Sequence, residues 1–211
     1  MNPLQKDEKR PNGPAKTLVV GLLGGVASGK SAVARLFREA GAVVLDADAW
    51  ARRELEKPET RAALEARLGP GLVGPGGKVD RKALAELVFR SPRARRILEE
   101  LIHPPVLARL RARLAELRRR PGTLVVLDVP LLLETGLDAL CDHLVFLETS
   151  PQERERRARA RGWPPGERER REKTQLPLET KRARADYILN NSGSLDETRK
   201  QVLDLLESWR A

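Results

Sequence analysis

The sequence predicts an α/β fold of three layers, with a five-stranded parallel sheet between helices, and three observations predict it. Residues 17–23 form an apolar, β-branched run of strand length. From residue 32 onward, apolar side chains recur at helical spacing until Gly41. Further short apolar runs then alternate with helical patterns along the chain, which is typical of a parallel sheet whose strands are joined by helices.

The turn between the first strand and helix carries a recognisable pattern. Residues 24–31 read Gly-Gly-Val-Ala-Ser-Gly-Lys-Ser, which satisfies the phosphate-loop pattern. Glycines let backbone N–H groups close around phosphate oxygens, and the helix N-terminus adds positive charge. Lys30 is expected to reach the β- and γ-phosphates of ATP, and Ser31 to ligate Mg²⁺. The alternative is a glycine-rich turn without a ligand. The predicted nucleotide-binding residues are Gly24, Gly25, Val26, Ala27, Ser28, Gly29, Lys30, Ser31 and Ala32.

Composition limits the function further. The 211 residues carry a formal net charge of +10, which favours an anionic partner, either nucleic acid or a substrate with several phosphates. Aromatic residues are not interleaved with basic ones, which argues against nucleic acid. The single Cys141 excludes an internal disulfide and fits a reducing cytoplasm. No apolar run has membrane-spanning length, and the polar residues 1–16 are predicted to form a disordered leader.

The second strand, residues 42–46, ends in Asp46-Ala47-Asp48, and a helix is predicted from residue 49 to about 57. Asp48 therefore lies just beyond the carboxyl end of a parallel strand, where such sheets bind ligands. The alternative is that Asp48 caps the following helix. Both roles are compatible.

Residues 50–119 contain no convincing strand and predict a helical insertion that recognises the second substrate. Helices are expected over 60–68, from Asp80, after Ser91, and from about Pro105 to residue 120. His103 precedes two prolines at a predicted helix boundary, and its spacing alone favours a structural role.

The third and fourth strands are predicted at 123–128 and 143–148. The third ends in Asp128, an acid placed to hold Mg²⁺ or its water. Ser150 and Glu153 form a predicted capping box that opens an Arg-rich helix.

On that helix Arg154, Arg157 and Arg161 share one face. A break at 162–166 and a second charged helix from 167 to about 174 complete a predicted lid over phosphates. The alternative is a solvated face of Glu–Arg pairs such as Glu153 with Arg157. A last strand within 184–191 and a closing helix that begins with a Ser194–Glu197 capping box end the chain.

Several motifs occur together in one order. They are Gly21–Gly25, Leu45–Asp48, Asp80–Leu84 with Val88-Phe89, Ile102–Pro104, Val129–Leu132 with Glu134, and Ala185-Asp186 with Asn190-Asn191. Together they resemble dephospho-coenzyme A kinase over roughly residues 18–193. The resemblance implies transfer of the γ-phosphoryl of ATP to the ribose 3′-hydroxyl of dephospho-coenzyme A, with Mg²⁺.

The resemblance also implies roles for individual residues. Asp48 would be the base at the acceptor hydroxyl, and Lys30, Arg157 and Arg161 would act on the phosphates. The acceptor would contact Asp48, Arg81, His103, Pro130 and Leu131, and the metal would contact Ser31 and Asp128. The chain departs from the family pattern at Ala27, Ala32 and Gly162-Trp163, and its leader has no counterpart.

The predicted organisation is a single kinase domain over 17–211. Its core comprises 17–49, 120–150 and 175–211, with an acceptor-binding insertion over about 50–119 and a lid over about 151–174. The expected partners are small molecules, without nucleic acid or membrane, in a cytoplasmic monomer or weak homo-oligomer. Three alternatives stay open: another small-molecule or nucleoside kinase, a nucleotide-binding switch, and a nucleic-acid-binding module.

Overall fold

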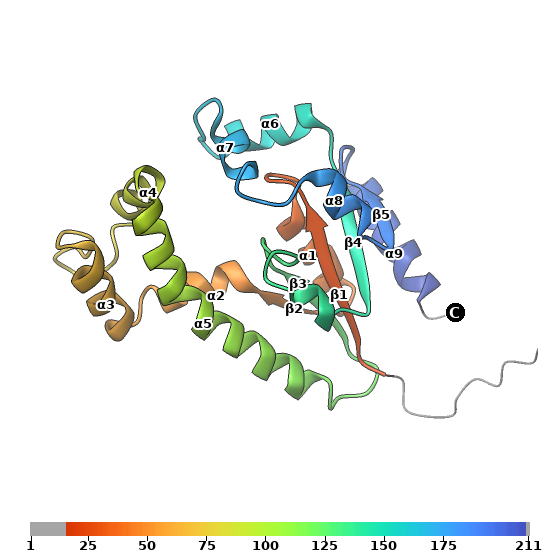
Figure 1. Ribbon diagram of the computed structural model, residues 1–211. Helices are drawn as coiled ribbons and strands as arrows, with labels where there is room; N and C mark the ends of the chain where they lie inside the picture. The colour runs from red at the N-terminus through yellow and green to blue at the C-terminus, as the bar shows by residue number, and fades with distance from the viewer. Residues whose placement is uncertain (1–15, 210–211) are drawn as a thin grey trace, which may run out of the picture.

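The structure is a computed structural model that describes residues 16–209. Its five strands form one all-parallel sheet in the order β2-β3-β1-β4-β5 (Figure 1). Their bounds are β1 Leu18–Gly24, β2 Val43–Asp46, β3 Leu124–Asp128, β4 His143–Glu148 and β5 Tyr187–Asn190. The predicted five-stranded parallel sheet is therefore confirmed. Because all strands point the same way, their carboxyl ends meet at one edge of the sheet.

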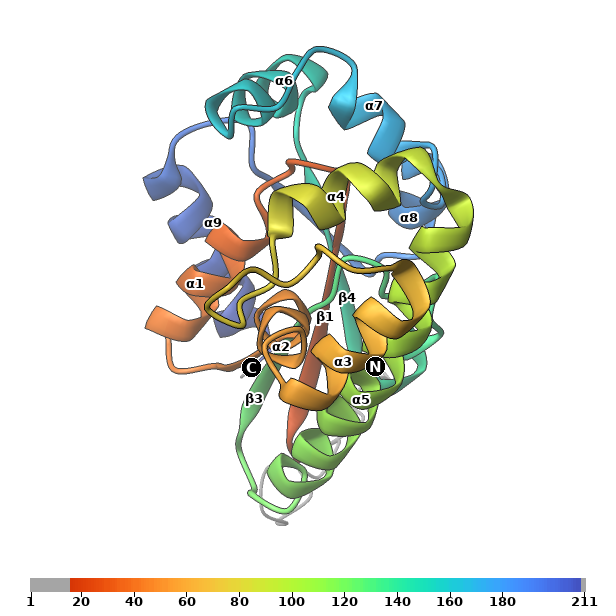
Figure 2. The same ribbon diagram turned by 90° about the vertical axis from the view of Figure 1, so that its left-hand side faces the viewer.

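Each face of the sheet is covered by helices (Figures 1 and 2). Helices α1 (Lys30–Glu39) and α9 (Leu195–Ser208) pack on one face, where Phe37 and Val202 are buried beside Val20. Helix α5 (Pro92–Leu117) packs on the other face, where Leu110 is buried in the cluster that contains Val19. Successive β1 residues thus point to opposite cores, as expected of a strand buried on both faces.

Four helices lie between β2 and β3, where the sequence predicts a helical insertion without strands; the two helices expected after Ser91 and from about Pro105 are one. They are α2 (Ala47–Glu54), α3 (Pro58–Leu68), α4 (Arg81–Arg90) and α5. A small separate cluster of buried residues, Leu64, Leu72, Val79 and Leu84, holds α3 and α4 together. Helices α3 and α4 stand away from the sheet, on the left of Figure 1.

The helix boundary predicted at His103 is wrong, because α5 runs without interruption through Pro104 and Pro105. Each proline removes one helical N–H donor. Apolar residues on both sides of the prolines, including Ile97, Ile102 and Val106, remain buried. Burial of this face therefore keeps α5 continuous through two prolines that would otherwise end a helix.

The chain after β3 forms a 3₁₀ turn (Leu137–Leu140), β4, and helices α6 (Pro151–Ala160), α7 (Glu167–Glu172) and α8 (Leu178–Ala183) before β5 and α9. Helix α8 was not predicted from the sequence. The Ser194–Glu197 capping box is confirmed. Only half of the predicted Ser150–Glu153 box forms, because the Glu153 carboxylate binds Arg156 and Arg157 instead.

The leader predicted over 1–16 falls outside the described residues except for Lys16. Within residues 16–209, no helix combines the length and the apolar character needed to cross a bilayer.

Candidate active site

A cavity of about 370 Å³ opens at the carboxyl edge of the sheet. Its walls come from segments far apart in the sequence: the loop 26–31, α2, the end of β3 and the segment that follows it, and the turn after α6. Of the predicted site residues, it brings together Val26, Ala27, Ser28, Gly29, Lys30, Ser31, Asp48, Asp128, Pro130, Leu131 and Arg161. We call it the reaction cavity.

The phosphate loop is shaped by backbone conformations that favour glycine. Gly29, the N-cap of α1, has φ of +92°, and Ala27 has φ of +62°. An L-residue pays roughly 1–2 kcal/mol for the left-handed conformation, so Ala27 holds the loop at some expense of stability. Ala27, one of the departures from the family pattern, thus adopts the left-handed conformation without being glycine.

Lys30 points back over the loop. Its Nζ donates hydrogen bonds of 3.2 Å to the carbonyls of Gly24 and Gly25. Burial lowers the pKa of Lys30 to about 8, although Asp128 and Asp48 act to raise it. A bound polyphosphate would replace the two carbonyls as the partner of this amine and favour its charged form.

Three carboxylates lie at the carboxyl edge of the sheet near the phosphate loop, and two of them, Asp48 and Asp128, act on the charge of Lys30. Asp46 and Asp128 are register partners on neighbouring strands, and Asp48 lies in the first turn of α2. Asp46 accepts a 2.8 Å hydrogen bond from the backbone N–H of Ala49 and is the N-cap of α2. The alternative role of Asp48 as the cap is therefore wrong, because the helix begins two residues earlier than predicted. The carboxylate of Asp48 is left to face the reaction cavity.

Burial raises the pKa of both cavity carboxyls. For Asp48, neighbouring Asp46 adds to the effect, and Arg52 and Lys30 oppose it. For Asp128, which is 6% exposed, a hydrogen bond from the Ser31 side chain and the charge of Lys30 oppose it. Raised pKa values at a ligand-binding edge are typical of groups that take up protons or cations.

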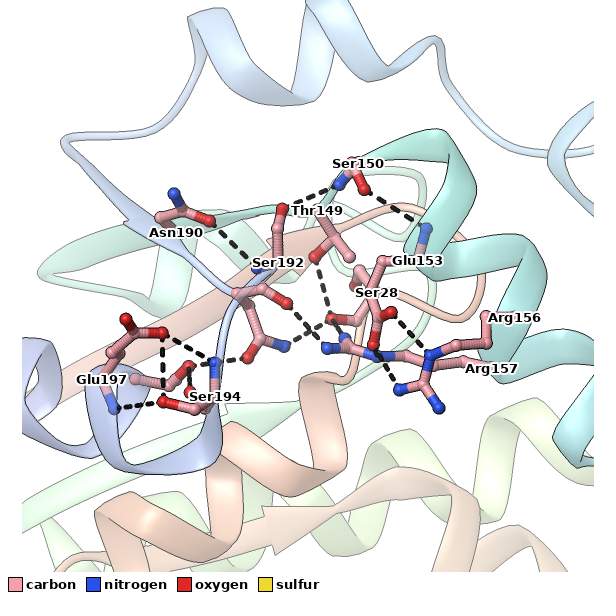
Figure 3. A network of polar contacts seen from close by, with 12 residues as sticks. Ser28, Thr149, Ser150, Glu153, Arg156, Arg157, Asn190, Ser192, Ser194 and Glu197 are labelled. Atoms are coloured by element: carbon pink, nitrogen blue, oxygen red, sulfur yellow. Dashed lines mark hydrogen bonds and ion pairs between the residues drawn. The ribbon is translucent and has the colours of Figure 1, made fainter.

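Arg157 does not line the reaction cavity and binds the phosphate loop through backbone carbonyls (Figure 3). Its Nη1 donates to the Ser28 carbonyl at 2.8 Å and its Nη2 to the Asn191 carbonyl at 2.7 Å. The same Ser28 carbonyl accepts from Nδ2 of Asn191 at 2.7 Å and from Oγ1 of Thr149 at 3.1 Å. A Cβ on Gly29 would lie 2.8 Å from the guanidinium and 2.5 Å from the Asn191 amide, so only glycine permits this approach.

The three arginines predicted to share one face of α6 have different surroundings. Arg154 is buried and pairs with Glu172, which ties α6 to α7. Arg157 also pairs with Glu153 at 2.8 Å, so the predicted Glu–Arg pair and the loop contact coexist. Arg161 lines the reaction cavity, lies over the ring of Trp163, and has no ion-pair partner within residues 16–209.

Two predicted acceptor residues are not brought to the reaction cavity. Arg81 pairs with Glu56 at 2.7 Å, and His103 is a half-buried residue of α5. Conversely, no sequence pattern singles out four residues of the cavity wall: Arg95, Arg171, Thr174 and Gln175. Asn191 stands out in the sequence only as part of the Asn190-Asn191 motif, and its contact with Ser28, 163 residues away, carries no local signal.

The fold and the site define a class of protein. A parallel sheet, a phosphate loop between β1 and α1, and an arginine-bearing helical segment over it describe a phosphate-loop kinase. The comparisons then give the family. Residues 18–197 match the model of the dephospho-CoA kinase family, and the chain belongs to that family. Its members transfer a phosphoryl group from ATP to dephospho-CoA in the last step of coenzyme A biosynthesis.

Individual relatives agree. A dephospho-CoA kinase of Symbiobacterium thermophilum is 43% identical over 197 residues, covering 92% of this chain and 80% of the relative. One of Halalkalibacterium halodurans is 37% identical, covering 92% and 97%. Among solved structures, TT1252 of Thermus thermophilus has a TM-score of 0.73 and 36% identity, with 92% and 98% coverage. A dephospho-CoA kinase of Campylobacter jejuni, at TM-score 0.65 and 23% identity, covers 90% and 95% and supports the fold alone.

Proposed function

We propose that the reaction cavity is where this chain phosphorylates the ribose 3′-hydroxyl of dephospho-CoA, with ATP on the phosphate loop and the acceptor at Asp48. One observation carries the proposal: Asp48 and Lys30 line the same cavity and interact electrostatically, although one belongs to α2 and the other to α1. A donor phosphate bound at Lys30 is then within the same small volume as an acceptor hydroxyl bound at Asp48.

The proposed step needs one proton acceptor and a set of cations. The 3′-oxygen forms a bond to the γ-phosphorus, the bond from that phosphorus to the bridging oxygen breaks, and ADP leaves. The proton of the 3′-hydroxyl passes to the Asp48 carboxylate, whose raised pKa favours accepting it. Lys30 offsets negative charge on the β- and γ-phosphates.

Mg²⁺ fits the residues beside the loop. No group of three or more His, Cys, Asp or Glu side chains in the described part of the chain is arranged to hold a metal by itself. Mg²⁺ on a nucleotide needs only one or two protein oxygens, because phosphates and water supply the rest. Ser31 and Asp128, which both line the cavity, would be those oxygens. When bound, the ion would offset charge between the β- and γ-phosphates.

The remaining roles follow the predicted organisation. Arg161 approaches the transferred phosphoryl group from the lid, about 151–174, and Arg157 supports it by holding the loop. In the insertion, about 50–119, Arg81 and His103 are assigned to the acceptor side on the family resemblance alone, since neither lines the reaction cavity. Within the core, Pro130 and Leu131 complete the acceptor wall beside Asp48. The enzyme acts on small molecules, as a cytoplasmic monomer or weak homo-oligomer.

The test is a coupled ADP-release assay with Mg-ATP and a panel of acceptors: dephospho-CoA, adenosine, nucleoside monophosphates and pantothenate. We expect the highest kcat/KM with dephospho-CoA. A nucleoside monophosphate preferred by tenfold or more would show a different kinase of the same fold. ATP hydrolysis that needs no acceptor would indicate a nucleotide switch.

A further inference from the structure

A buried ion pair beside the reaction cavity has no part in the steps described above. Nζ of Lys181 lies 3.0 Å from Oε1 of Glu134, and the lysine side chain is only 2% exposed. Lys181 belongs to α8, and Glu134 belongs to the segment that follows β3. Apolar side chains of similar size often stabilise a protein as well as a buried ion pair does. Stability alone therefore gives little reason for a charged pair at this place.

The ammonium group of Lys181 has a second partner, and that partner lines the reaction cavity. Lys181 Nζ donates a 2.9 Å hydrogen bond to Oε1 of Gln175, a half-buried residue of the cavity wall. The backbone around Gln175 is fixed as well. The Gln175 N–H donates to the Glu172 carbonyl at 2.9 Å, and the Leu176 N–H donates to Oε1 of Glu134 at 2.9 Å.

These contacts determine which way the Gln175 amide faces. A lysine ammonium has three donors and no acceptor, so only the amide oxygen can accept from it. The other end of the amide, Nε2 with its two N–H donors, makes no hydrogen bond to another residue among 16–209. Because Gln175 lines the reaction cavity, these donors are available to an oxygen of a bound ligand.

The ion pair also lies near the lysine of the phosphate loop. Burial is the main cause of the lowered pKa of Lys30; the charge of Lys181 adds to the lowering, and Glu134 opposes it. Burial acts to raise the pKa of Glu134, but hydrogen bonds from the Leu176 N–H and from Lys181 lower it overall. The carboxylate therefore stays charged and holds the ammonium, and with it the Gln175 amide, on the side of the cavity that contains Lys30.

We propose that Gln175 is a further catalytic residue, whose Nε2–H donates a hydrogen bond to an oxygen of the transferred phosphoryl group, and that Lys181 and Glu134 are positioning residues that orient its amide. The inference rests on the proposed function of the reaction cavity. A donor that is oriented before the reaction needs no rearrangement when charge on the phosphoryl oxygens changes during transfer. Without Lys181, the amide would be free to turn its carbonyl oxygen toward the phosphate, which repels it.

The first test compares wild type with Gln175→Met and Gln175→Glu, using the acceptor that wild type phosphorylates fastest. Methionine removes both ends of the amide, whereas glutamate keeps an oxygen for Lys181 and removes only the donor. We expect kcat to fall roughly tenfold to a hundredfold in both, the scale of one hydrogen bond to a charged group. In Gln175→Met the dissociation constant of ATP should change much less than kcat. Gln152→Met is the control, because Gln152 is an exposed glutamine of α6.

The second test is a double-mutant cycle for the positioning residues. Lys181→Met alone would leave a buried carboxylate without its partner, so it is combined with Glu134→Gln to keep the protein folded. This pair of changes should lower kcat about as much as Gln175→Met does. Added to Gln175→Met, it should cause little further loss, because residues that act through one another are not additive.

Three results would overturn the inference. Normal kcat in Gln175→Glu beside a loss in Gln175→Met would mean that Gln175 serves only to bind Lys181. A loss in Gln175→Glu alone would reflect the added negative charge and not a missing donor. Additive losses in the cycle would show that Lys181 and Glu134 do not act through Gln175. If the fastest acceptor is not dephospho-CoA, the proposed function fails, whereas the test of Gln175 still applies.

Discussion

The guanidinium of Arg157 donates a 2.8 Å hydrogen bond to the backbone carbonyl of Ser28, a residue 129 positions earlier in the phosphate loop. This contact joins the lid to the loop. The Ser28 carbonyl accepts hydrogen bonds from both Arg157 and Asn191, so these two side chains fix the orientation of the Ser28–Gly29 peptide. In a trans peptide the N–H points opposite to the carbonyl, toward the side where a phosphate would bind. Lid position and loop geometry are thereby linked by a small number of polar contacts (Figure 3).

Arg157→Lys tests whether geometry or charge matters at this position. A lysine keeps the charge but cannot span the carbonyls of Ser28 and Asn191 as a planar guanidinium does. We expect kcat/KM to fall by on the order of tenfold to a hundredfold, and Arg157→Ala to fall little further. Arg156→Lys is the control, since the Arg156 side chain is 71% exposed and binds only Glu153 among the described residues. Wild-type activity in Arg157→Lys would show that charge alone suffices.

Arg161→Ala should slow the transfer step more than it weakens ATP binding. Arg161 lines the reaction cavity and forms no ion pair with a carboxylate among residues 16–209. A cation aimed at the transferred phosphoryl group acts mainly in the transition state and is worth roughly 10³ or more. The measurement is kcat beside the dissociation constant of ATP. If kcat is unchanged in both Arg157→Ala and Arg161→Ala, the lid is only a charged surface.

Asp48→Asn should lower kcat by roughly 10² to 10⁴, the contribution of a positioned base. Its melting temperature should not fall, because Asp46 and not Asp48 caps α2. Asp46→Ala should instead affect mainly stability, with a loss of about 1 kcal/mol of unfolding free energy. Partial recovery of Asp48→Asn by added Mg²⁺ would indicate that Asp48 holds the metal instead.

ATP binding should take up a proton at alkaline pH. The pKa of Lys30 is held at about 8 in the free protein, and phosphates favour the charged amine. Above that pH the free protein carries a neutral Lys30, so ATP affinity should fall by up to tenfold per pH unit. Calorimetry in buffers of different ionisation enthalpy measures the uptake. Lys30→Met should abolish it and lower the rate by at least ~10²-fold; persistence of the uptake would assign the proton to another group.

Asp128→Asn should stabilise the nucleotide-free protein and impair catalysis. A carboxyl with a raised pKa binds protons more readily when folded than when unfolded. Its contribution to stability is therefore favourable at acid pH and falls as the pH rises from its ordinary 3.8 toward the raised value. At neutral pH the neutral amide removes this penalty, so the melting temperature should rise.

Added Mg-ATP should then stabilise Asp128→Asn less than wild type, because a metal ligand is missing. Asp204→Asn, at an exposed position of α9, is the control for charge removal. A lower melting temperature without ligand, together with an unchanged Mg²⁺ requirement, would contradict both parts of the argument.

Local sequence determined much of this protein. The strand runs, the loop 24–31 and the capping residues Asp80, Ser91 and Ser194 act through neighbouring residues, so they were readable from the chain and are found where they were predicted. The acids Asp48 and Asp128 were also predictable, because parallel strands bring their carboxyl ends to one edge.

Tertiary structure decided the rest, since it depends on contacts between residues far apart in the sequence. Burial of Ile102 and Val106 carries α5 through two prolines that locally end a helix. The same arginine-rich pattern on α6 yields a buried pair at Arg154, a loop contact at Arg157 and a cavity position at Arg161, because each meets a different neighbour. The three side chains carry the same charge, and their surroundings separate their roles.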